Sequence, residues 1–172
     1  MSNAVFEAVR TVLAVREYRD EEIPADVLDR IVEAAHLSAS SMNRQPWHFV
    51  VVTGRDALRE LGGLVRTGPY IASAAAAIVV AYERDSRFGV SDGSRAIQSM
   101  ILTAWAEGVG SNWAGFAGGM EQVREHVGLP GEFDVLAVVP FGYPARALGR
   151  GKKNRQPLGE VASAGRYGTP YG

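Results

Sequence analysis

The most constraining feature of the sequence is an unbroken apolar run, AAIVVAY, at residues 76–82. A strand with one face in water alternates apolar and polar side chains, and this run has no polar position. It therefore predicts a strand that is covered on both faces. A run rich in aromatic and β-branched residues at 47–53 and an apolar run at 134–141 predict two further strands.

Segments with apolar residues at helical spacing separate these strands. They predict helices over residues 6–13, 24–37, 55–65, 92–107 and 120–127, and a short strand is expected over 111–114. The segment 92–107 is apolar nearly all round, which predicts a place in the core or in a subunit interface. Because helices and strands alternate without repeats or linkers, we expect one α+β or α/β domain over residues 1–172.

The composition excludes several functions. The 18 Lys and Arg residues balance 19 Asp and Glu residues, so we expect no nucleic-acid partner and no anionic membrane partner. The chain has no cysteine, which excludes disulfides, thiolate metal sites and a cysteine nucleophile. Because we find neither a secretory signal nor an apolar run of about 20 residues, we expect a cytoplasmic location.

The most informative polar stretch is SSMNRQPW at residues 40–47, between a predicted helix and a predicted strand. Its hydroxyl and amide groups offer donors and acceptors to an uncharged polar face of a ligand. The same residues suit a capped helix end followed by an ordinary turn. Taken alone, they favour the turn slightly.

Three other features are weak by themselves. Arg16 follows the first predicted helix in a charged stretch, up to Glu22, that is typical of a solvated loop. The glycine in SNWAGF at 111–116 permits close approach of a ligand to the backbone, but it also suits a strand end or bulge. The basic cluster KKNR at 152–155 is able to hold a phosphate, and a solvated tail has the same composition.

Other patterns that carry chemistry are missing from the sequence. The three histidines, His36, His48 and His126, are dispersed, so we expect neither a metal cluster nor a Ser-His-Asp triad. The dinucleotide fingerprint GxGxxG and the Walker loop are also absent. Each histidine is therefore interpreted as structural.

Four features follow one another along the chain: Arg16, the polar stretch at 40–47, the glycine-containing stretch at 111–116 and the basic cluster at 152–155. Together they resemble the nitroreductase family of flavoproteins over nearly the whole chain. The matching motifs are VREY at 15–18, EAAHLSASSMNRQPW at 33–47, GVGS at 108–111, GYP at 142–144 and KNRQPL at 153–158. The resemblance implies an α+β fold with a central mixed β-sheet flanked by helices. It also implies a homodimer, with a central helix in the interface and two FMN sites there.

The resemblance implies roles for individual residues. Arg16 matches a cation at the pyrimidine edge of FMN, where it stabilises the negative charge of the reduced flavin. Ala114 and Gly115 match backbone whose N–H groups approach flavin N5, and Lys153 and Arg155 match a pair that holds the phosphate. The cofactor-binding residues expected in this way are Arg16, Ser40, Ser41, Asn43, Thr67, Trp113, Ala114, Gly115, Lys153 and Arg155. Among them, Ser40, Ser41 and Asn43 match loop residues that reach the flavin from the opposite subunit.

The implied activity is that of an FMN-dependent oxidoreductase. NAD(P)H delivers a hydride to flavin N5 and leaves, and an electron-poor acceptor such as a nitroaromatic or a quinone is then reduced in the same pocket, which gives ping-pong kinetics. This scheme requires no catalytic acid or base from the protein. The alternatives are a flavin-sequestering module with little turnover, another flavin reaction such as dehalogenation or desaturation, and a flavin-free interaction protein that retains the dimer.

One departure from the family concerns the phosphate of the cofactor. Many members carry basic and hydroxyl residues just before the position of Arg16, whereas this chain has Val12, Leu13 and Ala14. Each missing charge-assisted hydrogen bond is expected to cost about 1.5–3 kcal/mol of binding free energy. The basic cluster at 152–155 is the candidate replacement, and without it FMN binding is expected to be weak.

Overall fold

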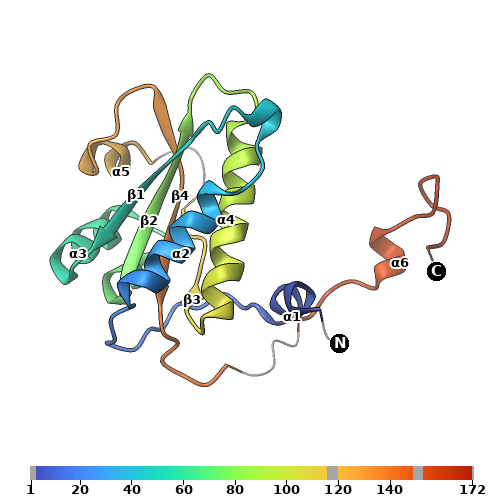
Figure 1. Cartoon of the computed structure of the whole chain (residues 1–172), viewed down its shortest axis with the longest axis horizontal. Coiled ribbons are helices and arrows are strands. Elements are labelled where there is room, and N and C mark those ends of the chain that lie inside the picture. Colours follow the sequence, from blue (N-terminus) through green and yellow to red (C-terminus); the bar gives the residue numbers. More distant parts are fainter. Residues whose placement is uncertain (1–2, 116–119, 149–152, 172) are drawn as a thin grey trace.

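The predicted helices and strands are all present, with ends that differ by a few residues from the expected ones. The computed structural model describes residues 3–115, 120–148 and 153–171. Its elements are α1 (Ala4–Thr11), α2 (Ala25–His36), η1 (Ser41–Asn43), β1 (Trp47–Thr53), α3 (Arg55–Leu64), η2 (Pro69–Ser73), β2 (Ala76–Glu83), α4 (Gly89–Ala106), β3 (Gly110–Ser111), α5 (Glu121–His126), β4 (Phe133–Gly142) and α6 (Leu158–Val161) (Figure 1).

The strands form one four-stranded sheet in the order β1-β2-β4-β3. Neighbouring strands are antiparallel, and parallel pairing occurs at an isolated bridge between Ala14 and Ser111. The expected mixed character is thus confined, in the described residues, to the point where the segment after α1 joins the edge of the sheet. Residues 76–81 of β2 are all buried, which confirms the prediction of cover on both faces.

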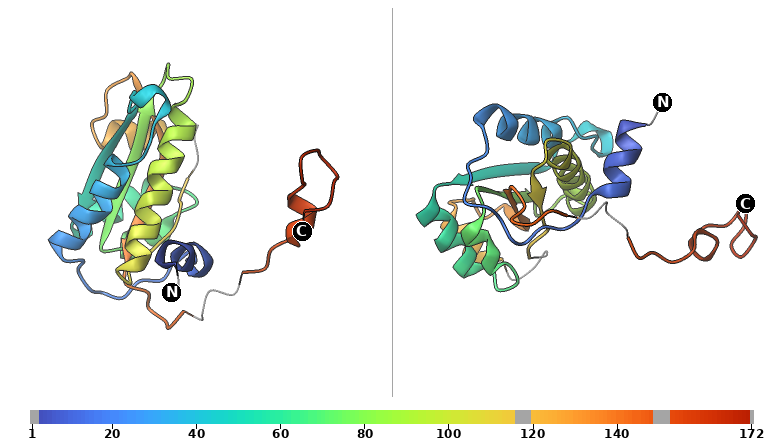
Figure 2. Two further views of the ribbon diagram at one scale, coloured as in Figure 1. Left: turned by 45° about the vertical axis from the view of Figure 1, so that its right-hand side comes forward. Right: turned by 90° about the horizontal axis from the view of Figure 1, so that it is seen from below.

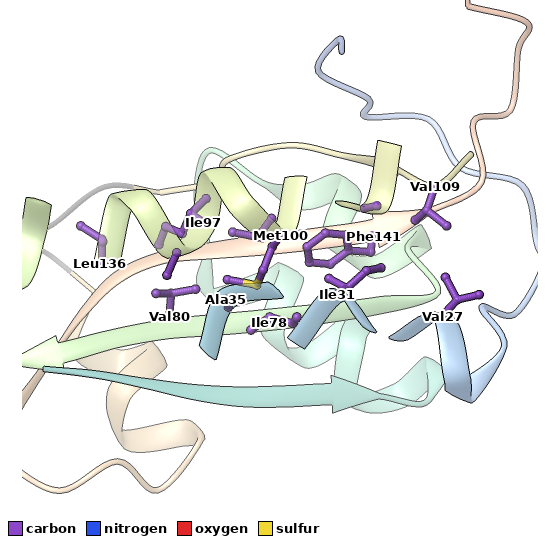
Figure 3. Packing of buried hydrophobic residues seen from close by; sticks show 14 residues of the cluster. Val27, Ile31, Ala35, Ile78, Val80, Ile97, Met100, Val109, Leu136 and Phe141 are labelled. Atoms are coloured by element: carbon purple, nitrogen blue, oxygen red, sulfur yellow. The ribbon is translucent and has the colours of Figure 1, made fainter. Parts of the chain in front are cut away.

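Helices cover the two faces of the sheet. Helices α2 and α4 lie together on one face, and α3 and α5 lie on the other (Figures 1 and 2). The side chains of β2 divide accordingly, because Ile78 and Val80 pack against α2 and α4 whereas Val79 belongs to the opposite cluster. Figure 3 shows Ile31, Met100 and other residues of the α2/α4 cluster around these strands.

A β-bulge in β4 brings α4 close to the sheet. Val80 pairs with Ala137 and Ala81 pairs with Val135, so Leu136 is an extra residue in β4. Leu136 is fully buried on the α4 side, where its Cδ2 lies 2.8 Å from the position of a Cβ on Gly93. A Cβ at position 93 would therefore displace the end of the Leu136 side chain.

The segment after α1 is attached to the sheet and differs in part from the solvated loop predicted there. Tyr18 is buried, its Oη donates a 2.7 Å hydrogen bond to the carbonyl of Val15, and it forms a bridge with Pro144. Its ring occupies the space that a side chain on Gly142 would need. The Tyr18 ring is therefore buried although its neighbours in the sequence are charged. This burial raises the pKa of the Tyr18 phenol above its usual value.

Residues 153–171, the C-terminal tail, extend away from the sheet and the helices that cover it (Figures 1 and 2). Apolar side chains of this tail are exposed, among them Leu158 and Val161 of α6 at 63% each. Helix α1 also exposes Val5 and Phe6. None of the helices in the described part of the chain is long and apolar enough to cross a lipid bilayer.

Candidate cofactor site

Arg16 is held at the edge of the sheet by the residue before it. The backbone N–H of Val15 donates to the carbonyl of Ser111 at 2.9 Å. The Val15 side chain is buried against Gly110, where Val15 Cγ2 lies 2.5 Å from the position of a Cβ. The segment that carries Arg16 is therefore fixed to β3 by both backbone and side-chain contacts.

The Arg16 side chain is exposed and lies beside Tyr70. Its guanidinium carbon is 5.9 Å from the centre of the Tyr70 ring, a distance at which a cation is attracted to an aromatic face. The Tyr70 hydroxyl accepts a hydrogen bond from Nδ2 of Asn112, which also donates to the carbonyl of Trp113 at 3.0 Å. Tyr70 and Asn112 thus connect Arg16 to the segment after β3.

A pocket of about 240 Å³ opens beside Arg16. Its walls come from two segments, one after α1 and one after β4, which are joined by the bridge between Tyr18 and Pro144. The lining residues are Ala14, Val15, Arg16, Glu17, Pro144, Arg146 and Leu148. The pocket therefore combines apolar side chains with two guanidinium groups and one carboxylate.

Thr67, Ala114 and Gly115 also lie together. The N–H of Gly115 donates to Oγ1 of Thr67 at 3.1 Å, and Ala114 forms two 2.9 Å backbone hydrogen bonds with Val138. Both N–H groups that the resemblance directed at flavin N5 thus have acceptors within the chain. The Thr67 hydroxyl accepts through its oxygen and retains its own proton for donation. Trp113, between these residues and Asn112, is half-buried against the α2/α4 cluster.

The loop with Ser40, Ser41 and Asn43 is anchored by Asp92, a residue of α4 with no exposed surface. Oδ2 of Asp92 accepts from the N–H of Ser41 at 2.9 Å, and Oδ1 accepts from the Ser41 hydroxyl at 3.3 Å. Arg95 lies 3.2 Å from the same carboxylate and balances its charge.

The backbone of this loop is unusual for residues with side chains. Met42, Asn43 and Gln45 all have left-handed backbone, with φ between 52° and 54°. Such conformations cost energy outside glycine and persist where surrounding contacts impose them. Ser40 supplies one such contact, because its Oγ accepts from the N–H of Gln45 at 2.9 Å.

Within one chain, the two halves of the expected site lie at opposite ends of the sheet. The Ser40 loop precedes Trp47, which pairs with Tyr82 at the end of β2. The residues around Arg16 adjoin Ser111, which pairs with Phe141, and Phe141 pairs in turn with Ala76 at the start of β2. At about 3.3 Å per residue, the ends of β2 are about 20 Å apart.

Lys153 and Arg155 lie in the tail. Nζ of Lys153 donates to the carbonyl of Val9 at 2.5 Å, in the last turn of α1, where helical carbonyls lack partners. Partial burial and the nearby Arg155 guanidinium lower the pKa of Lys153. Arg155 is exposed and donates to the adjacent Asn154 carbonyl. The remaining basic residue of this cluster, Lys152, lies outside the described residues.

The structure thus connects Arg16, through Tyr70 and Asn112, to the segment after β3 that carries Trp113, Ala114 and Gly115, with Thr67 bonded to Gly115. It leaves the Ser40 loop at the far end of the sheet. Sequence reasoning missed Tyr70 and the anchor Asp92. Asn112 belongs to the SNWAGF motif at 111–116, whereas Tyr70 follows Gly68-Pro69 and has no local sequence signal of its own. Their roles depend on contacts between distant segments.

Comparison with known proteins establishes the family. The sequence profile of the Nitroreductase family matches residues 10–83 and 69–143. This chain belongs to the nitroreductase family. A relative from Methanothermobacter thermautotrophicus, named "Putative NADH dehydrogenase/NAD(P)H nitroreductase", is 33% identical over 152 residues, which cover 84% of this chain and 80% of the relative.

Solved structures of the nitroreductase fold agree with this assignment. A Bacteroides thetaiotaomicron protein of the same name superposes with a TM-score of 0.88 at 27% identity, over 97% of this chain and all of that one (100%). An FMN-dependent nitroreductase from Clostridium difficile gives a TM-score of 0.87 at 22% identity, over 94% and 99% of the two chains. The second comparison supports the fold alone.

Proposed function

We propose that this nitroreductase is an FMN-dependent oxidoreductase that uses NAD(P)H, with residues 1–172 acting as one FMN-binding domain. The observation that carries the proposal is the exposed Arg16 guanidinium, fixed beside Tyr70 at the mouth of a pocket of about 240 Å³. A bound FMN would supply hydride chemistry at N5 between NAD(P)H and an electron-poor acceptor such as a nitroaromatic or a quinone, with ping-pong kinetics. The names of the similar proteins given above support this proposal, since they read NADH dehydrogenase/NAD(P)H nitroreductase and, for the Clostridium difficile protein, FMN-dependent nitroreductase.

The residues present fit such a cofactor. A flavin mononucleotide carries a flat ring that becomes anionic on reduction and a phosphate that is anionic throughout. The pocket offers apolar walls, including Val15 and Leu148, together with the cations Arg16 and Arg146. Outside the lining of this pocket, the Thr67 hydroxyl accepts from Gly115 and keeps a proton that it can donate. In this proposal Arg16 stabilises the reduced ring, and Lys153 and Arg155 hold the phosphate.

A second copy of the chain completes the site in this proposal. Ser40 and Asn43 lie too far from Arg16 to contact the same ligand within one chain, since they are at the other end of the sheet. The exposed apolar residues of α1 and of the tail, such as Phe6 and Val161, offer surface that an association of two copies would bury. We therefore propose a homodimer in which the Ser40 loop of one copy adjoins Arg16 of the other.

The test is an absorption spectrum of the FMN-loaded protein under anaerobic conditions. The proposal predicts that the oxidised-flavin bands bleach on addition of NADH or NADPH and return on addition of a nitroaromatic or a quinone. A flavin that stays oxidised with both nucleotides would identify a sequestering module instead. Protein that does not take up FMN would contradict the proposed function altogether.

A further inference from the structure

We propose that Arg146 binds the phosphate of the cofactor and that Glu17 competes with the phosphate for this guanidinium. The inference rests on the proposed function, and it concerns a residue that the sequence analysis did not include. It replaces the charge that is missing before Arg16 with a cation from the segment after β4.

A further cation is needed for the phosphate because the segment after α1 lacks side-chain donors before Arg16. Residues 12–14 carry only apolar side chains. Ala14 lines the pocket and is bound to the sheet through its bridge with Ser111, so the part of this wall that precedes Arg16 offers an anion no side-chain donor. Lys153 is engaged with the carbonyl of Val9, and Arg155 contacts its neighbour in the tail. Neither residue is among those that line the pocket, so a cation on another of its walls would act beside these two tail residues as a further phosphate ligand.

Arg146 forms that other wall. It lines the same pocket as Ala14 and Arg16. The segment that carries it is fixed to the segment after α1, because the N–H of Ala145 donates to the carbonyl of Glu17 at 2.9 Å. Backbone pairing thus holds Arg146 opposite the position where the family's usual side-chain donors are missing.

The charges near Arg146 leave it available to an anion. Nε of Arg146 lies 2.9 Å from Oε2 of Glu17, and the side chains are 79% and 62% exposed, respectively. An exposed pair of this kind is weakly held. A guanidinium has five N–H donors in a planar fork that suits phosphate, and phosphate carries more negative charge than a carboxylate.

Arg19, another arginine close to Arg146, is a weaker candidate for binding the phosphate. Arg146 also lines a second pocket of about 460 Å³, which Arg19 and Trp105 share. The Arg19 guanidinium lies over the Tyr143 ring at 5.2 Å and pairs with Glu21 at 3.1 Å. Arg19 does not line the pocket of Arg16, whereas Arg146 borders both pockets.

The experiment compares FMN with riboflavin, which lacks the phosphate, by flavin fluorescence quenching. Arg146→Gln is expected to raise the Kd of FMN about tenfold and to leave that of riboflavin within about twofold, as for loss of one charge-assisted hydrogen bond. Glu17→Gln is expected to lower the Kd of FMN and to have no such effect in the Arg146→Gln background. Arg84→Gln, which removes a half-exposed arginine paired with Asp134 outside this pocket, is the control and should leave both Kd values unchanged.

Three outcomes would overturn the inference. An Arg146→Gln variant with both Kd values unchanged, or with both raised equally, would exclude a contact with the phosphate. Wild-type protein that binds riboflavin as tightly as FMN would show that the phosphate is not recognised, and the flavin function would survive. Wild-type protein that binds neither flavin would instead refute the proposed function itself.

Discussion

Replacing Asp92 by alanine is expected to lower the free energy of unfolding by about 3 kcal/mol, because a buried carboxylate that accepts several hydrogen bonds is lost. Asp92 has no exposed surface and accepts from both the N–H and the hydroxyl of Ser41. The variant leaves these donors without their acceptor beside a new cavity. Arg95 is half-exposed and is solvated in the variant, so it adds little to the loss.

The same variant is expected to release the Ser40 loop. The left-handed backbone at Met42, Asn43 and Gln45 persists because contacts hold it, and Asp92 supplies the contact that connects the loop to α4. Urea unfolding gives the stability, and hydrogen exchange of residues 38–46 gives the local effect. Asp26→Ala, which removes an exposed carboxylate from an ion pair with Arg30, is the control and should cost less than about 0.5 kcal/mol. Equal losses in the two variants would contradict the role given to Asp92.

Adding one methyl group at position 110 is expected to destabilise the protein by about 2–3 kcal/mol, the upper range for overpacking. The Cβ of Gly110→Ala would lie 2.5 Å from Cγ2 and 2.7 Å from Cβ of Val15. Val15 is buried and its backbone is bonded to Ser111, so it has little room to move. Any displacement would carry Arg16 with it, and the account therefore also predicts weaker FMN binding.

Gly63→Ala is the matched control for this substitution. A Cβ at Gly63 meets nothing within 4 Å, and the residue lies inside α3. Alanine has a higher helix propensity than glycine, so the control is expected to gain about 0.5–1 kcal/mol. Thermal and urea unfolding of the two variants should therefore shift in opposite directions. A Gly110→Ala variant as stable as the wild type would refute the close packing of Val15 against β3.

Much of the fold could be predicted because its elements have local signals. The apolar run at 76–82 required two covered faces, and β2 has them. Helix α4 was predicted from its apolar residues, which pack on the sheet. The bulge at Leu136 and the burial of Tyr18 could not be predicted, because both depend on glycines in distant segments that leave room for a side chain.

The candidate site shows the same division between local and distant signals. The sequence motifs predicted that Arg16 and the Ser40 loop belong to one flavin site. They did not predict that the two lie at opposite ends of the sheet within one chain. That separation follows from strand pairing, in which Trp47 and Ser111 occupy different edges and ends. The positioning residues Tyr70 and Asp92 act through the tertiary contacts that this pairing creates.

In the proposed homodimer, the flavin site is built from the Arg16 side of one copy and the Ser40 loop of another. The most direct measurement is the FMN stoichiometry of co-expressed Arg16→Ala and Asn43→Gly chains. Glycine at 43 keeps the left-handed backbone (φ 54°) while removing the carboxamide. Each variant alone has one defect in every site, whereas a mixed dimer has one intact site and one with both defects. The account predicts little FMN on either variant alone and about one quarter of the sites filled in the mixture, and a mixture that binds no more FMN than its parents would contradict it.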